Sequence, residues 1–463
     1  MTSTASQNSR TLRSTVSQNS RTLTSTVSQN SRTLTSTASQ NSRTLTSRAS
    51  TNSGPPLVIP IFIPHAGCPH KCIFCNQNAI TSSTDMTMPD PYHIDKTVDE
   101  YLKYRGDRKE AELAFFGGNF LGLSARWINS FLDTAGKLVK SGKIDGIRFS
   151  TRPDTITDQS LELIAQYPVS TVELGVQSMN DNVLDAVGRG HGAEDTLRAG
   201  AKLRAVLPGC RLGMQMMAGL PLESHEMTLE SARKMADLSP DFVRIYPLVV
   251  LGGSRLATWY HRGRYTPLTL EDAIEIVKKL YLLFTSRGIP VIRMGLQASD
   301  IMEDQRVMLA GPWHPAFGHL VHSRIFLDRA GELIKAAITN SKITGTDLAE
   351  KYNNPAEQAD KLAEQADNQA KQDHNQAKQD HNQAKQDDNQ AEQDDNQAEQ
   401  ANNTAEISSG VKKLTLTVHP SSLSRLQGDK KSNLKKLHEL FPSIRICIMC
   451  DKSLDKNEIS IKK

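Results

Sequence analysis

Short runs of apolar residues recur through the middle of the chain and alternate with stretches in which apolar residues return every three or four positions. The runs predict six strands, which lie at 57–64, 112–116, 146–151, 171–177, 211–217 and 241–247. The stretches predict helices near 92–104, 124–140, 157–166, 193–206 and 226–238. Because a connection long enough for a helix separates the strands, the sequence predicts an α/β fold with a parallel sheet and helices outside it.

Two arrangements of a parallel sheet fit six such units: a partial (β/α)6 TIM-like barrel and a doubly wound open sheet. The ends of the strands carry polar residues or glycines, among them Arg152, Gln177, Gly219 and Tyr246. In barrels the chemistry gathers at the carboxyl ends of the strands, so these positions are the first candidates for a site. We expect the partial barrel, and the pattern alone leaves the open sheet as the alternative.

The pattern changes after residue 250 and predicts a second, smaller folded part. Its elements are a helix at 270–286, a strand at 290–294, a strand at 412–418, two short helices within 421–440 and a strand at 445–449. We therefore divide the folded chain into a core at 56–250, an extension of that core at 251–350 and a small α+β lobe at 411–463.

Two repeat tracts lie outside these elements and carry too few apolar side chains to form a core. In residues 1–55 the sequence SQNSRTL returns every 11 residues, and in 351–410 a seven-residue unit drifts from NQAKQDH to NQAEQDD. One alanine per heptad cannot form the seam of a coiled coil, so we expect both tracts to be disordered. The Arg-rich, acid-free N-terminus also fits an organelle transit peptide, which stays open as an alternative.

Charge is distributed unevenly among these parts. Residues 1–55 carry six arginines and no acid, 351–410 have a net charge of −8, and 411–463 have a net charge of +7. The segment between the tracts is nearly neutral, which is typical of a packed enzyme domain.

Composition excludes several classes of protein. The chain of 463 residues is 38% hydrophobic, its mean hydropathy is −0.45, and nowhere do 18 apolar residues run together. It therefore predicts no transmembrane helix. Six cysteines are too few for a disulfide-stapled secreted scaffold, and no apolar signal-peptide core follows Met1. We expect a cytoplasmic protein that contacts no membrane.

A loop with three cysteines follows the first predicted strand. Cys68, Cys72 and Cys75 are spaced C-x3-C-x2-C, so their thiols can converge on one metal centre. A zinc site would need a fourth ligand, for which His65 or His70 could serve. A [4Fe–4S] cluster usually takes four thiolates, and three would leave one iron open to an exogenous ligand. The remaining cysteines, Cys210, Cys447 and Cys450, predict ordinary packing, because a strand at 445–449 would point the last two to opposite faces.

The spacing, with an aromatic residue before the last cysteine, resembles the radical S-adenosylmethionine (SAM) superfamily. Further segments resemble one branch of it, the radical SAM domain of the Elongator catalytic subunit and its bacterial relatives. These segments are Phe116-Gly117-Gly118-Asn119-Phe120, Ser150–Asp154, Glu173–Ser178, Arg189-Gly190-His191, Met216–Pro221, Val243–Pro247 and Gly263-Arg264-Tyr265. The resemblance covers about 58–325. It differs from the Elongator subunit in its compact cysteine spacing, and nothing after 325 resembles an acetyltransferase domain, so acetyl transfer is not expected.

The resemblance implies a partial barrel, a [4Fe–4S] cluster ligated by Cys68, Cys72 and Cys75, and SAM on the open iron. SAM cleavage would release a 5′-deoxyadenosyl radical that takes hydrogen from an unknown substrate. The residues that the motifs place near SAM are Phe74, Gly117, Gly118, Asn119, Arg152 and Gln177. Asn119 stands where the superfamily often has Glu. Tyr246 is a candidate hydrogen donor, and a buried, hydrogen-bonded phenol is the simpler interpretation. His191 is expected to satisfy hydrogen-bonding groups of its loop rather than to take part in catalysis.

Three hypotheses on partners and function follow. A radical SAM enzyme needs an electron donor of the flavodoxin or ferredoxin type, and the Elongator resemblance points to modification of transfer RNA (tRNA). The lobe at 411–463 resembles the core of a KH domain, in which a GXXG loop clamps the nucleic-acid backbone. Here the loop is Gly428-Asp429-Lys430-Lys431, with a lysine where the second glycine belongs. The alternatives are a solvated basic face on the lobe and a non-catalytic protein whose cysteines hold zinc or a structural cluster.

Overall fold

The computed structural model describes residues 56–63, 67–68, 72–76, 88–296, 304, 306–339 and 412–462. The two repeat tracts and the ligand candidates His65 and His70 lie outside the described residues. Among those that are described, no helix is both long enough and apolar enough to cross a bilayer.

The core is one sheet of seven parallel strands in the order β1-β2-β3-β4-β5-β6-β8. The strands are β1 Leu57–Phe62, β2 Ala111–Phe116, β3 Gly146–Thr151, β4 Val169–Gln177, β5 Arg211–Ala218, β6 Phe242–Pro247 and β8 Val291–Met294. A doubly wound sheet reverses its strand order at a switch point, whereas here every crossover proceeds in one direction. The partial TIM-like barrel is therefore confirmed. The strand predicted at 290–294 also exists, and it extends the sheet by a seventh position that the sequence pattern did not assign to it.

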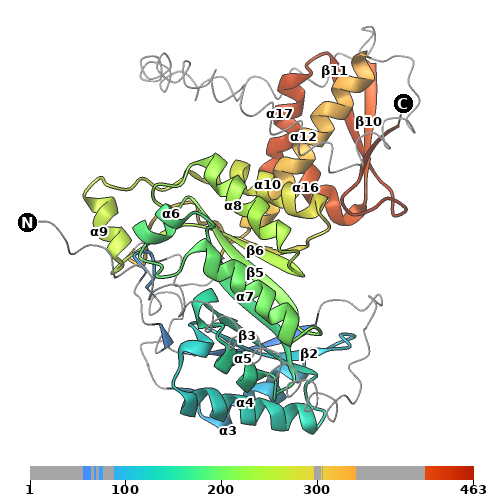
Figure 1. Ribbon diagram of the computed structural model, residues 1–463. Helices are drawn as coiled ribbons and strands as arrows, with labels where there is room; N and C mark the ends of the chain where they lie inside the picture. The colour runs from blue at the N-terminus through green and yellow to red at the C-terminus, as the bar shows by residue number, and fades with distance from the viewer. Residues whose placement is uncertain are drawn as a thin grey trace, which may run out of the picture. The chain divides into compact units, whose positions relative to one another are not determined.

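Helices follow the strands and cover one face of this sheet (Figure 1). They are α3 Pro91–Leu102, α4 Ala125–Lys140, α5 Asp158–Ile164, α7 Ala193–Val206, α8 His225–Asp237 and α10 Leu270–Ser286. Two further helices, α6 Asp181–Ala186 and α9 Arg255–His261, pack in a separate hydrophobic cluster and were not predicted. Alternate strand residues such as Phe115, Phe149 and Met214 point to this face and are fully buried.

The opposite face of the strands carries charged side chains, which are buried as ion pairs. Arg148 on β3 lies between Glu112 on β2, at 3.2 Å, and Glu173 on β4, with a 2.7 Å hydrogen bond from its Nε. Glu173 also pairs with Arg244 on β6 at 2.8 Å, and Glu112 pairs with Arg211 on β5 at 2.7 Å. The two acids are less than 2% exposed. This inner ion network connects five neighbouring strands.

The Glu112 carboxyl shows how the network keeps a charge buried. Burial alone would raise its pKa, but the Arg211 guanidinium outweighs that effect together with further groups, and the pKa lies below its usual value. The hydroxyls of Ser170 and Thr171 donate hydrogen bonds of 2.6 and 2.7 Å to Glu112 Oε1. The acid is therefore ionised at neutral pH, as a paired buried charge must be.

The C-terminal lobe is a three-stranded sheet covered by helices. Its elements are β10 Lys412–Val418, α16 Leu423–Gln427, α17 Ser432–Leu440, β11 Ile444–Cys450 and β12 Ile459–Lys462. The strand order is β11-β10-β12, with β10 parallel to β11 and antiparallel to β12. A two-stranded ribbon of β7, Val250–Leu251, and β9, Met308–Ala310, lies apart from both larger sheets.

A long helix that the sequence did not predict, α12 Phe317–Thr339, completes the lobe. Phe326, Leu327, Ala330 and Ile334 pack with Leu416 and other lobe residues in one hydrophobic cluster. Other residues of α12 contact α10 of the barrel. Apolar residues therefore lie on two sides of α12, and the single apolar stripe that reveals a surface helix is missing. The domain boundaries proposed from the sequence stay predictions, and α12 joins the extension at 251–350 to the lobe.

Removal of one charge from the inner network should destabilise the protein strongly. Glu173→Gln leaves the Arg148 and Arg244 guanidinium groups buried without their shared acid, and we expect a loss of about 3–5 kcal/mol in the free energy of unfolding. The control is Glu230→Gln, which breaks an exposed pair with Arg233 and should cost about 0–1 kcal/mol. Urea denaturation measures both, and equal losses in the two variants would contradict the role given to the network.

Candidate functional site

The three cysteines of the loop after β1 lie in a partly buried position. Cys72 is buried, and Cys68 and Cys75 are half-buried. Burial raises the pKa of the Cys75 thiol to about 12, and the neighbouring thiols of Cys72 and Cys68 add to that rise. Burial also raises the pKa of Cys68, against the lowering effect of Arg189 and Arg152. The fold therefore brings the three thiols within electrostatic reach of one another and of two cations.

The thiols are not arranged around a single ion. Across the described residues, no group of three or more His, Cys, Asp or Glu side chains could hold one metal ion. Thiolates that share one zinc lie about 4 Å apart, as tetrahedral bonds of about 2.3 Å require. Thiolates that bind separate irons of a cluster lie farther apart.

Backbone hydrogen bonds fix the C-terminal half of the cysteine loop. The Ile73 amide donates to the Val187 carbonyl at 3.0 Å, and the Leu256 amide at the start of α9 donates to the Ile73 carbonyl at 2.8 Å. The Ile73 side chain is fully buried in a cluster with Leu220, Leu248 and Leu256. Phe74, which the motif places near the adenine of SAM, packs at the edge of this cluster and keeps part of its ring exposed.

A second anchor holds the N-terminal half of the loop. The Asn119 side chain donates a 2.9 Å hydrogen bond to the Gly67 carbonyl, and its Oδ1 accepts from the Thr151 hydroxyl at 2.7 Å and from the Arg152 amide at 3.1 Å. A Cβ on Gly122 would lie 2.0 Å from the Gly67 oxygen and 2.2 Å from Asn119 Nδ2, so only glycine permits this approach. Asn119 therefore ties the cysteine loop to the end of β3, in addition to any contact with SAM.

Two more predicted residues lie at strand ends with unusual backbone conformations. Gly117 has φ +104°, and a Cβ there would lie 2.7 Å from the Ile63 carbonyl oxygen, so this glycine serves the close approach of β2 to β1; Gly118 follows it in the same turn. Gln177 has φ +70° beside an irregularity in the pairing of β4 with β5. A non-glycine residue in the left-handed region is strained, and such strain concentrates at functional sites.

Arg152 and Tyr246 have partners within the chain. Arg152 is buried and makes two hydrogen bonds to Asp154, of 2.9 and 3.0 Å, while its Nη1 is buried without a partner. Arg152 is therefore a salt-bridged arginine at the rim of the barrel, and Nη1 is the one atom left for a ligand. Tyr246 lies above the inner network, where burial raises its pKa against the lowering effect of Arg244.

Sequence reasoning missed Arg189, whose guanidinium lies beside the thiols. Its Nη1 is 3.5 Å from Cys72 Sγ, its Nη2 donates to the Gly175 carbonyl at 2.5 Å, and its Nε is buried without a partner. Within the described part of the chain it has no carboxylate partner. The only signal was its place in the segment Arg189-Gly190-His191.

His191 faces the same group of cations. Burial, with Arg189 and Arg152, lowers its pKa to about 3, so the imidazole is neutral. Both ring nitrogens are buried without a hydrogen bond of normal geometry, although the Val176 backbone is near enough to act on the pKa. Four buried nitrogens of Arg152, Arg189 and His191 therefore lack hydrogen-bond partners among the described residues beside the cysteine loop.

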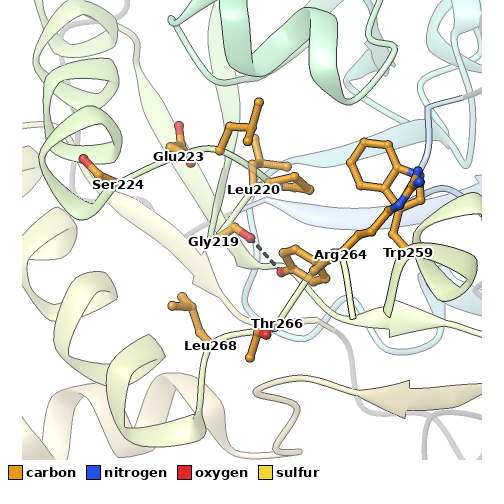
Figure 2. A pocket seen from close by; sticks show the side chains of 11 residues that line it. Gly219, Leu220, Glu223, Ser224, Trp259, Arg264, Thr266 and Leu268 are labelled. Atoms are coloured by element: carbon orange, nitrogen blue, oxygen red, sulfur yellow. Dashed lines mark hydrogen bonds between the residues drawn. The ribbon is translucent and has the colours of Figure 1, made fainter. Parts of the chain in front are cut away.

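A cavity of about 380 Å³ opens where β5 ends (Figure 2). One wall is the turn Gly219–Ser224, and the other comes from Trp259 and the segment Arg264–Thr266. The Tyr265 hydroxyl donates to the Gly219 carbonyl at 2.7 Å and closes the floor. Glu223 accepts a 2.8 Å bond from Ser178, and burial raises its pKa to about 7. This cavity lies at the carboxyl edge of the sheet, where barrels bind substrates.

The other cysteines differ from one another. Cys210 is buried, as expected of a packing residue. Both remaining cysteines lie on β11, which confirms the predicted strand. The expectation of packing is wrong for Cys450, which is exposed, because the strand carries it past the edge of the lobe's hydrophobic cluster.

Comparison with protein-family models matches residues 62–235 to the radical SAM superfamily and 240–326 to the radical SAM C-terminal domain. Together the two models cover more than half of the chain. The chain belongs to the radical SAM superfamily and is an enzyme. Its curated relatives place it near the Elongator branch, as the motifs predicted.

Among these relatives is the tRNA uridine(34) acetyltransferase of Methanocaldococcus infernus, 28% identical over 258 residues, which are 48% of this chain and 48% of that protein. The tRNA uridine(34) acetyltransferase of Dehalococcoides mccartyi is 27% identical, over 51% of this chain and 60% of its own length. Elongator complex protein 3 of Saccharomyces cerevisiae is 28% identical, over 42% of this chain and 38% of its own length. The chain spans about half the length of the curated relatives it matches. Among solved structures, Methanocaldococcus infernus Elp3 with an N-terminal deletion matches with a TM-score of 0.47 and 23% identity, over 61% of this chain and 64% of that one.

Substitution of Gly122 should release the cysteine loop from its Asn119 anchor. In Gly122→Ala the new methyl group would overlap the Gly67 carbonyl and the Asn119 amide, so we expect a lower melting temperature and reduced iron loading after anaerobic reconstitution. Gly136→Ala is the control, since a Cβ in that helix meets only the Tyr167 ring at 3.6 Å and alanine favours helices. Iron loading of Gly122→Ala equal to that of Gly136→Ala would show that the loop does not depend on this contact.

Proposed function

We propose that Cys68, Cys72 and Cys75 hold a [4Fe–4S] cluster and that the chain binds SAM beside it. Such a cluster supplies the electron that cleaves the sulfonium of SAM and yields a 5′-deoxyadenosyl radical. The main support is the four nitrogens beside the thiols that lack partners among the described residues. Arg189 in particular is a buried cation with no carboxylate partner among those residues, which is costly, and the thiolates of the cluster and the carboxylate of SAM are the anions that would balance it.

The residues around the loop have separate tasks in this proposal. The Arg189 guanidinium bridges the Cys72 sulfur and the Gly175 carbonyl, and its free Nε is available to a carboxylate. Arg152 Nη1 and the neutral His191 add donors to the same place. Gly117, Gly118, Phe74 and Gln177 stay predicted SAM contacts at the strand ends. Tyr246 stays a candidate hydrogen donor.

The proposed substrate is RNA, and tRNA in particular. The support is that two of the relatives described above are tRNA uridine(34) acetyltransferases. The matched residues are those of the radical SAM part, so acetyl transfer is not included. A flavodoxin- or ferredoxin-type donor in the cytoplasm would supply the electron. The competing function is a non-catalytic protein whose cysteines hold zinc or a structural cluster, and the arrangement of the thiols favours the cluster over zinc.

Removal of any one loop cysteine should abolish the cluster, because three ligands leave no spare. Cys68→Ala, Cys72→Ala and Cys75→Ala should each lose iron and sulfide after anaerobic reconstitution and form no 5′-deoxyadenosine with dithionite and SAM. Cys210→Ala, Cys447→Ala and Cys450→Ala should keep both. Stoichiometric zinc in place of iron would support the non-catalytic function, and iron loss in Cys450→Ala would reveal a second metal site.

Arg189 should contribute to SAM binding. In Arg189→Met the charge-assisted bonds disappear, and we expect SAM affinity to fall about tenfold to a hundredfold while iron content persists. Arg198→Met, on the exposed face of α7, is the control and should bind SAM normally. Anaerobic equilibrium binding measures both variants. Unchanged SAM affinity in Arg189→Met would remove this residue from the site.

A further inference from the structure

A compact basic surface lies on the helix–loop–helix of the lobe. Lys430 and Lys431 form the loop, and Lys435 and Lys436 follow on the first turns of α17; all four are exposed. Within the described residues none of the four forms an ion pair, whereas the half-buried Lys143 of the barrel pairs with two aspartates. We call Arg425, Lys430, Lys431, Lys435 and Lys436 the basic loop surface.

The loop has a strained backbone. Lys430 and Lys431 have φ values of +47° and +63°, in the left-handed region. This conformation is unfavourable for a residue with a side chain, because its Cβ comes too close to the backbone. Glycine or asparagine would adopt it more easily, so the folded lobe is less stable with two consecutive lysines here than it would be with those residues. The lysine at the second glycine position of a GXXG loop has the left-handed φ that a glycine would readily adopt.

The loop is held on a rigid base. A Cβ on Gly428 would lie 2.6 to 2.8 Å from Ser432 and Asn433, so the approach requires glycine. Asn433 Nδ2 donates hydrogen bonds of 2.9 Å to both the backbone and the hydroxyl oxygen of Ser323 on α12. The lysine side chains are therefore presented from a turn between α16 and α17 that hydrogen bonds fix to α12.

We propose that the basic loop surface binds the phosphate backbone of the RNA substrate, an inference that rests on the proposed function. Several unpaired cations in a short segment match the spaced charges of a phosphodiester chain. No aromatic residue lies between 411 and 440, so the segment lacks both the rings that stack on bases and those that anchor a membrane. The surface therefore holds RNA without reading its sequence, since phosphate contacts position and do not specify.

The first test reverses the charge of the loop. In Lys430→Glu with Lys431→Glu, we expect the affinity for tRNA at low salt to fall at least tenfold. The slope of log K against log salt should flatten by about 1.4 to 1.8 for two lost phosphate contacts. The control is Lys137→Glu with Lys140→Glu, on the exposed side of α4. It has the same change in net charge and should bind tRNA nearly as the wild type does. SAM cleavage without RNA should persist in both, which separates this inference from the proposed function.

A second variant separates binding from folding. Lys430→Asn with Lys431→Gly suits the left-handed backbone, so it should unfold at a higher temperature than the wild type and yet bind tRNA more weakly. Greater stability with unchanged tRNA affinity would show that the lysines have no role in binding. Wild-type tRNA affinity in the charge-reversed variant would likewise overturn the proposal. So would a charge-reversed variant that binds tRNA normally but no longer binds anionic lipid vesicles.

Discussion

The barrel depends on the pairing of charges that it buries on its inner face. Glu112 and Glu173 are each shared between two arginines from other strands of the sheet, so the strands must meet in one register for every charge to find a partner. A slip of one residue would turn these side chains toward the helices, where they would be unpaired among apolar groups. The network thus fixes the strand ends, and with them the loops at the carboxyl edge of the sheet.

The candidate site is built from those loops and inherits their positions. The cysteine loop is attached on one side to Asn119 and the end of β3, and on the other to Val187 and the start of α9. Arg189 then reaches Cys72 from 117 residues away in sequence. The Asn119 backbone acts on Cys68 from the first of these attachments, and the glycines Gly67 and Gly122 allow the loop to approach closely enough for this to occur.

Sequence reasoning located the strands and most helices because each strand has a continuous apolar run and ends at a glycine or polar residue. It also located the cysteines, since they are close together in the chain. It could not find Arg189 or the inner ion network, because both consist of residues brought together only by the strand order. It missed α12, whose apolar residues serve two neighbours and so lack a single periodic face. Asn119 was identified, but its anchoring role depends on a contact with Gly67 that no local pattern contains.

The shared helix α12 also bears on how the gene for this protein can change. The lobe is assembled from α12, which ends at Thr339, and from strands that begin at Lys412, so its folding requires closure of the 72 residues between them. The composition of this segment predicts a flexible chain, for which the entropy cost of closure grows only with the logarithm of its length. One more or one fewer heptad changes that cost by about 0.1 kcal/mol. Expansion or contraction of the repeat therefore changes the stability of the lobe too little for selection on that stability to oppose it.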